Sequence, residues 1–195
     1  MSTIAENIAK VAARIRAAAQ ASGRDPAHIQ LLAVSKTKPA QAVREAFACG
    51  QRDFGENYLQ EALSKQQELA DLPITWHFIG PIQSNKTRPI AEHFAWVHSV
   101  DRLKIAQRLS EQRPANLPPL KICLQVNISG EASKSGCSPA ELPALAAAVA
   151  KLTNLQLCGL MAIPEPSDDL AQQRAACAQL RQLASDLQPP LATLS

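Results

Sequence analysis

Residues 31–39 read LLAVSKTKP, a short apolar run that leads into a lysine and then into a proline. The apolar run is typical of a strand buried on both faces, and a proline suits the first turn of a helix. We therefore expect Lys36 to stand at the carboxyl end of a strand, just before a helix begins. A strand followed by a helix is the unit from which parallel sheets are built.

Outward from this stretch, apolar runs and helical patterns alternate at intervals of about 25 to 30 residues, which is the rhythm of repeated strand and helix units. The first twenty residues carry apolar side chains at helical spacing, and a long helix is expected over 169–187. Ser138 and Glu141 have the spacing of a capping box, with Pro139 at the first helical position. The expected strands lie at 29–35, 53–55, 75–79, 96–100, 120–127 and 155–162, with the start of a seventh at 191–195.

The number of units favours a barrel. Eight strand and helix units that close on themselves need about 200 to 250 residues. Six units and the beginning of a seventh within 195 residues predict an α/β fold of the TIM-type (β/α)8 barrel kind, truncated after the start of strand seven and forming one domain over 1–195. The rival is an open doubly wound sheet. That fold commonly carries a glycine-rich turn after its first strand, whereas residues 35–38 contain no glycine.

Composition narrows the classes of function. With 46% hydrophobic residues, the chain can bury one substantial core. The net charge is only +3 and no run of five like charges occurs, so nucleic acid is not the expected partner. Basic residues gather after two of the expected strands, Lys36 with Lys38 and Lys86 with Arg88, which favours a small anionic ligand.

The cysteines and the first residues of the chain indicate in which cellular compartment the protein is expected. Five cysteines at wide spacing do not resemble a zinc site or a redox dithiol, and we expect them to be reduced and mostly buried. The opening residues include Glu6 and lack an uninterrupted apolar stretch, so neither a secretory signal nor a membrane anchor is expected. These features predict a cytoplasmic protein.

Lys36 is the leading candidate for chemistry. A lysine at a strand end, partly desolvated and close to other cations, can attack a carbonyl to form a Schiff base. The plain alternative is a surface lysine that closes a strand. In a parallel barrel the loops after the strands' carboxyl ends form the site, so the polar segments 56–58, 83–86 and 133–136 become candidates as well.

Each further candidate also has a structural interpretation. Asn57 can cap the helix that follows it, and Asn85 can do the same while Lys86 is solvated. His77 lies inside an expected strand, where alternation points it away from both neighbours, and it can be a hydrogen-bonded core histidine. Met161 would be a packing residue in most proteins, yet a soft side chain there can also lie against a flat heteroaromatic ring.

Five segments, taken together and in this order, resemble the pyridoxal phosphate homeostasis proteins, and the likeness to their bacterial members spans nearly the whole chain. They are LLAVSKTKP at 31–39, FGENYLQE at 54–61, HFIGPIQSNK at 77–86, VNISGEASKSG at 126–136 and GLMAIP at 159–164. Each segment is weak evidence alone, but each also falls at an expected barrel mouth.

The resemblance implies a single-domain barrel related to the amino-terminal domain of alanine racemase. It implies pyridoxal 5′-phosphate (PLP) bound as a reversible internal aldimine to Lys36, with a role in vitamin B6 and amino-acid homeostasis and no established catalysis. Asn57, Asn85, Lys86, Met161 and His77 are the neighbours expected around the cofactor. PLP-dependent apoenzymes that receive the cofactor are the macromolecular partners to consider, and we expect a monomer.

Two enzymatic alternatives remain. The first is a PLP-dependent racemase-like enzyme, which needs acid and base groups on both faces of the substrate carbon. In alanine racemase one face is served by a tyrosine from a second domain, whereas this chain has one tyrosine, Tyr58. The second alternative is a cofactor-free aldolase in which Lys36 attacks a sugar or keto-acid carbonyl.

The likeness breaks down at the carboxyl end. Family members continue past the position of Ser195, and the resemblance places the phosphate cradle in that continuation. We therefore expect the 195-residue chain to hold PLP more weakly than a version extended by the two missing strands.

Overall fold

The computed structural model describes residues 3–130 and 135–195. The chain divides into two compact units, Met1–Trp76 and His77–Ser195. Strand β3 (Thr75–Phe78) carries the chain from the first unit into the second.

The first unit alternates helix and strand. Its elements are α1 (Ile4–Ala21), η1 (Pro26–His28), β1 (Ala33–Val34), α2 (Ala40–Ala48), β2 (Asp53–Glu56) and α3 (Leu59–Glu68). Strands β1 and β2 are parallel, with Ala33 opposite Phe54. The amide of Thr75, at the start of β3, donates to the carbonyl of Arg52 at 2.9 Å. These pairings bring the carboxyl ends of β1 and β2 to one edge.

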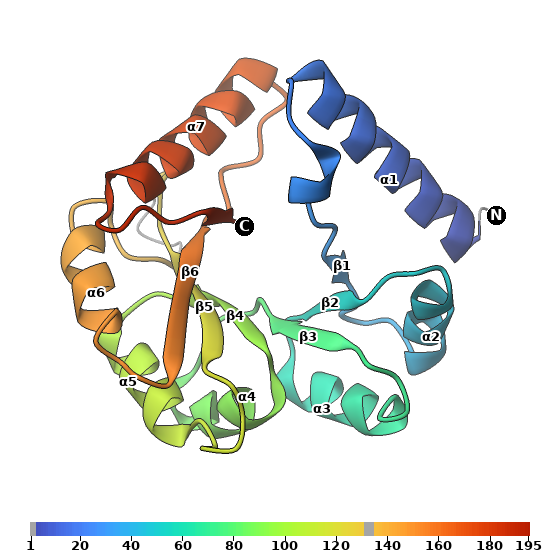
Figure 1. Cartoon of the computed structure of the whole chain (residues 1–195), viewed down its shortest axis with the longest axis horizontal. Helices are drawn as coiled ribbons and strands as arrows, with labels where there is room; N and C mark the ends of the chain where they lie inside the picture. The colour runs from blue at the N-terminus through green and yellow to red at the C-terminus, as the bar shows by residue number, and fades with distance from the viewer. Residues whose placement is uncertain (1–2, 131–134) are drawn as a thin grey trace. The chain divides into compact units, whose positions relative to one another are not determined.

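The second unit is a parallel sheet with strands in chain order. After β3 come η2 (Ser84–Lys86), α4 (Thr87–His93), β4 (Trp96–Val100), α5 (Leu103–Gln112), β5 (Leu120–Gln125), α6 (Leu142–Val149), β6 (Leu155–Met161), α7 (Leu170–Asp186) and β7 (Thr193–Leu194). Figure 1 shows α4, α5 and α6 along one side of β4, β5 and β6. Ile122 and Leu124 of β5 are fully buried, as are Ile105 and Leu109 of α5, so the core of this unit lies between the sheet and its helices.

Strand β4 has the predicted bounds, whereas the prediction for the first strand is too long. Only Ala33 and Val34 pair with β2, and residues 29–32 of the predicted strand belong to no helix or strand. The side-chain amide of Gln51 donates to the carbonyl of Leu31 at 2.8 Å, which takes the place of a strand neighbour. The seventh strand is likewise shorter than expected, since it covers Thr193–Leu194.

The helix boundaries are largely as expected. The Ser138 amide donates to Glu141 and the Glu141 amide donates to the Ser138 hydroxyl, so the capping box is confirmed. The α-helix itself begins at Leu142 rather than at Pro139, because the box closes a turn that precedes the helix. Gly50 follows α2 with a φ of +94°, the left-handed conformation that glycine adopts most easily.

Backbones approach very closely where β6 meets β7. A Cβ added to Gly159 would meet the Thr193 carbonyl oxygen at 2.0 Å, so only glycine fits this position. No helix within the described ranges is long and apolar enough to span a bilayer.

The expectation of mostly buried cysteines is wrong. All five are free, but only Cys123 and Cys137 are buried, while Cys158 is half-buried and both Cys49 and Cys177 are exposed. Cys49 is the C-cap residue of α2 and Cys177 lies on α7, and at both positions the small side chain faces solvent rather than the core.

Candidate functional site

Lys36 lies in a tight turn directly after β1. The turn is closed by the Lys38 amide, which donates to the Ser35 carbonyl at 3.0 Å. Lys36 is exposed, whereas Ser35 before it is buried. Thr37 has a φ of +63°, a conformation in which a β-branched residue is strained. Lys36 is therefore exposed to solvent on a turn whose backbone is strained at the next residue, Thr37.

Beneath this turn lies a buried lysine, Lys65 of α3, which is only 4% exposed. Its ammonium donates to the Ser35 carbonyl at 2.6 Å, to Glu56 Oε1 at 2.7 Å and to Glu61 Oε1 at 2.6 Å. Glu56 ends β2 and is fully buried, and Glu61 lies one turn before Lys65 on the same helix. We call these three side chains the Lys65 cluster.

The Lys65 cluster reaches the lysine turn through two more hydrogen bonds. The Ser35 hydroxyl donates to Glu56 Oε1 at 2.7 Å, and the Thr37 amide donates to Glu61 Oε1 at 2.6 Å. The hydrogen bond from Lys65, together with that from Thr37, lowers the pKa of Glu61 below its usual value and favours the carboxylate. The residues before and after Lys36 are thus both tied to the same three side chains.

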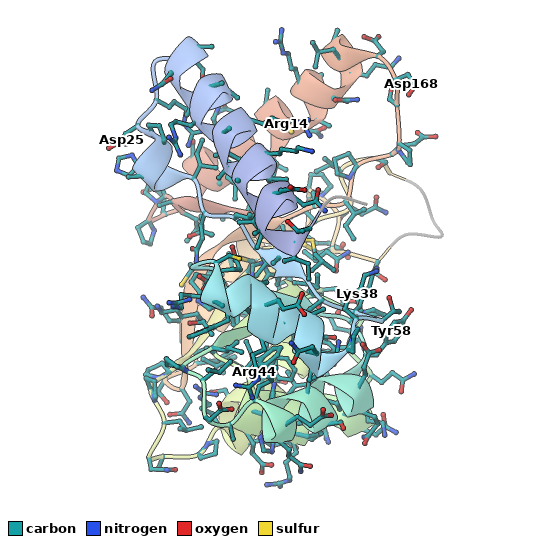
Figure 2. All side chains as sticks on the ribbon, turned by 90° about the vertical axis from the view of Figure 1, so that its right-hand side faces the viewer. Arg14, Asp25, Lys38, Arg44, Tyr58 and Asp168 are labelled. Atoms are coloured by element: carbon teal, nitrogen blue, oxygen red, sulfur yellow. The ribbon has the colours of Figure 1, made fainter. Side chains whose placement is uncertain are left out.

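Asn57 stands after β2 and offers an unused acceptor. The helix that follows has Tyr58 as its N-cap and no side-chain cap, so the interpretation of Asn57 as a cap is wrong. The Oδ1 atom of Asn57 is buried and has no hydrogen-bond partner among the residues that the structure describes. Figure 2 shows Lys38, two residues beyond Lys36, and Tyr58, directly after Asn57, on the same side in that view. A buried acceptor without a donor is costly and fits a group that a ligand would satisfy.

In the second unit, Asn85 and Lys86 lie in η2 after β3, and both are exposed. Lys86 is the N-cap residue of α4 and Gln83 that of η2, so Asn85 caps neither helix and that interpretation is wrong as well. Met161 ends β6 and is buried at 4% exposure. Asn85 and Lys86 thus follow a strand and Met161 is the last residue of one, as the sequence predicts.

His77 belongs to a buried row of rings. Its Nδ1 lies 2.9 Å from Nε2 of His98 on the neighbouring strand, and its ring stacks on Trp96 with 5.6 Å between centroids. Nδ1 of His98 lies 2.7 Å from the Ser195 hydroxyl. Burial, together with the nearby His77, lowers the pKa of His98 from 6.5 to about 4, so the imidazole is neutral near neutral pH. The hydrogen-bonded core position considered for His77 is the one observed.

The predicted residues fall in two groups. Lys36 and Asn57 belong to the first unit, and Asn85, Lys86, Met161 and His77 belong to the second. Of the segment 133–136, Ser133 and Lys134 lie outside the described residues.

Sequence reasoning missed the Lys65 cluster. The one available signal was the Glu61 and Lys65 pair, an acidic and a basic residue four positions apart on a helix. Such a pair usually marks a solvated face, and nothing local indicates that Lys65 is buried against a carboxylate from the preceding strand.

Comparison with known sequences gives a consistent family. Residues 6–195 match the family described as alanine racemase, N-terminal domain. The chain is 78% identical over 195 residues to a Pseudomonas aeruginosa protein named "Pyridoxal phosphate homeostasis protein", and the match covers 85% of that protein. A protein of the same name from Escherichia coli K12 is 56% identical over 92% of this chain and 78% of its own length.

Solved structures extend the comparison to the fold. PipY of Synechococcus elongatus with PLP bound is 41% identical, with a TM-score of 0.84 over 98% of this chain and 87% of that chain. Alanine racemase from Corynebacterium glutamicum is 16% identical, with a TM-score of 0.65 over 94% of this chain and 52% of that chain, which concerns the fold alone. The predicted α/β barrel class, of the kind found in the alanine racemase amino-terminal domain, is confirmed.

Proposed function

Taking as premise that this chain belongs to the pyridoxal phosphate homeostasis proteins, within the alanine racemase N-terminal domain family, we propose that it holds PLP reversibly and acts in vitamin B6 and amino-acid homeostasis. The observation that carries the proposal is the exposed Lys36 on a strained turn after β1. The solved relative PipY, which has PLP bound in its structure, supports it.

The residues of the first unit fit such a cofactor. When bound, PLP supplies an aldehyde to which a lysine amine can attach with loss of one water. Lys36 is the amine that we propose for this attachment, since it is exposed and its turn is fixed on both sides. Asn57 would accept a hydrogen bond from the cofactor through its unpartnered Oδ1. In the second unit, Asn85, Lys86, Met161 and His77 stay as predicted neighbours.

We propose that the protein is not an enzyme. Racemisation needs a proton donor and a proton acceptor on opposite faces of the substrate carbon. The chain has a single tyrosine, Tyr58, which is 56% exposed. Incubation of the loaded protein with L- and D-amino acids should give no enantiomer exchange by chiral chromatography, and measurable turnover would favour the racemase-like alternative.

We further propose that residues 1–195 act as one PLP-binding barrel domain, monomeric and cytoplasmic, from which PLP-dependent apoenzymes receive the cofactor. Reversible attachment suits a protein that stores and releases a reactive aldehyde, because the free aldehyde reacts with amines in general.

A direct test is to locate the attachment. The protein is incubated with PLP, reduced with borohydride, digested and analysed by mass spectrometry. We expect one phosphopyridoxyl group, on Lys36. Attachment only at Lys38, two residues away, would overturn the assignment of Lys36, and a protein that takes up no label would overturn the PLP-binding function itself.

A further inference from the structure

We propose that the Lys65 cluster, formed by Glu56, Glu61 and Lys65, is a positioning device that fixes the turn carrying Lys36. This inference rests on the proposed function, because it assigns a purpose to groups that surround the amine without being the amine. The three side chains are positioning residues: they act through the backbone on either side of Lys36.

The first argument is geometric. The backbone on the amino side of Lys36 is held at Ser35, whose carbonyl accepts from Lys65 at 2.6 Å and whose hydroxyl donates to Glu56 at 2.7 Å. The backbone on the carboxyl side is held at Thr37, whose amide donates to Glu61 at 2.6 Å. Two anchors, one on each side, fix the direction in which the Lys36 side chain leaves the backbone.

The second argument is the strain at Thr37. Its φ of +63° is the only positive value at a non-glycine residue in the part of the chain that the structure describes. Such a conformation is unfavourable for a β-branched residue and persists only where the surroundings impose it. The Thr37 amide donates to Glu61 in this conformation, and we infer that this hydrogen bond helps to hold it.

The third argument concerns what buried charges contribute. The side chain of Lys65 is 5% exposed and that of Glu56 is fully buried. Replacing a buried ion pair by well-packed apolar residues is often neutral or stabilising, because removing charges from water is costly. Stability alone is therefore a poor reason for this arrangement. Holding the turn in place is a better one, since three short hydrogen bonds tie Lys65 to the turn, to β2 and to α3 at once.

The test uses Glu61, which is the most accessible member of the cluster at 31% side-chain exposure. Glu61→Ala removes the acceptor for the Thr37 amide. Glu61→Gln removes the charge but keeps a carbonyl oxygen that can accept the same hydrogen bond. Asp71→Asn is the matched control, because it removes the carboxylate of an exposed ion pair with Arg44 elsewhere in the same unit. The Arg44 side chain is labelled in Figure 2.

The measured quantity is the rate of PLP loading, followed by visible absorbance and confirmed by the mass of the reduced protein. We expect E61A to load on the order of tenfold more slowly than the unmodified chain, as a loss of alignment predicts. E61Q should load at a rate much closer to that of the unmodified chain, and D71N should be unchanged. Thermal melting without PLP establishes that each variant is folded.

A second comparison tests the strain itself. Glycine adopts a φ near +63° without penalty, so T37G should need the Glu61 acceptor less. We expect the loading defect of E61A to be clearly smaller in the T37G background than in the unmodified chain. If Glu61 had only a structural role, E61A would lower the melting temperature by the same amount in both backgrounds. The rate at which the folded protein loads PLP would then be unchanged.

The outcomes separate the two proposals. If the unmodified chain takes up PLP on Lys36 but E61A loads at the same rate, the positioning role is wrong and the proposed function stands. If E61A and E61Q are slowed equally, the charge matters rather than the hydrogen bond, and the positioning role is again wrong. If the unmodified chain takes up no PLP, the proposed function fails, and the positioning role fails with it.

Discussion

At the scale of single residues, two atoms carry the proposed site in the first unit. The Lys36 amine is exposed at the end of β1, and the Asn57 Oδ1 atom is buried without a partner at the end of β2. The Asn57 atom is unusual because a buried acceptor normally finds a donor. A residue that makes the free protein less stable than it could be is a good candidate for a ligand contact.

Asn57→Ala therefore has two opposite effects. The melting temperature of the free protein should stay level or rise, because the variant no longer buries an unsatisfied oxygen. Affinity for PLP should fall by about threefold to tenfold, the loss of one hydrogen bond of about 1 kcal/mol. Both are read from thermal melts with and without PLP.

Asn116→Ala, in the exposed loop before β5, is the control and should change neither quantity. A free protein strongly destabilised by Asn57→Ala would mean that Asn57 has a structural partner after all. Unchanged PLP affinity would remove Asn57 from the site.

At the scale of elements, β3 and β4 are joined by side chains as well as by backbone. His77 and His98 share a hydrogen bond, Trp96 stacks on His77, and Lys121 of β5 lies 5.3 Å from the centre of the Trp96 ring. The two imidazoles cannot both be charged at 2.9 Å without strong repulsion. Protonation of His98 is therefore opposed by burial and by its neighbour.

This predicts a specific dependence of stability on pH. The pKa of His98 is about 4 in the folded chain against an ordinary value of 6.5, so between these values the unfolded chain binds a proton that the folded chain does not. The free energy of unfolding should fall as pH drops through this window, by about 3 kcal/mol for this residue, and then level off. Urea unfolding at several pH values measures it.

His98→Gln is the comparison, since glutamine keeps a polar group and does not titrate. Its stability should depend less on pH between 6.5 and 4 than that of the unmodified chain. Parallel curves for the two proteins would show that His98 does not carry the effect.

The elements also show what local sequence can predict. The sequence predicts strand β4 to the residue, and in the structure four of its five residues, Val97 to Val100, are buried. Strand β1 was predicted too long because the Leu31 carbonyl bonds to the side chain of Gln51, twenty positions away. The Lys65 cluster depends on contacts across 9 and 30 positions, which no helical or strand period encodes.

At the scale of the whole molecule, the chain boundary between the two compact units lies inside β3. Each unit has its own tryptophan: Trp76 packs near Phe54 in the first, with 6.1 Å between ring centroids, and Trp96 stacks on His77 in the second. The sequence predicted one domain over 1–195 from the count of strand and helix units. Whether the two units unfold together, as one domain would, can be measured directly.

Single-tryptophan variants report the unfolding of each unit separately. Trp76→Phe leaves a fluorophore in the second unit only, and Trp96→Phe leaves one in the first only. If 1–195 is one domain, the fluorescence transition in urea should coincide with the circular dichroism transition within each variant. Separate midpoints for the two probes within one variant would show that the units unfold independently.

The bonding of Lys65 has a consequence for chemical selectivity. Its nitrogen donates to the Ser35 carbonyl and to two carboxylates, and its side chain is only 5% exposed. Lys36, next along the chain from Ser35, stands in water. Acylating agents and cross-linkers should therefore modify the exposed Lys36 far more readily than Lys65, which the fold keeps away from solvent.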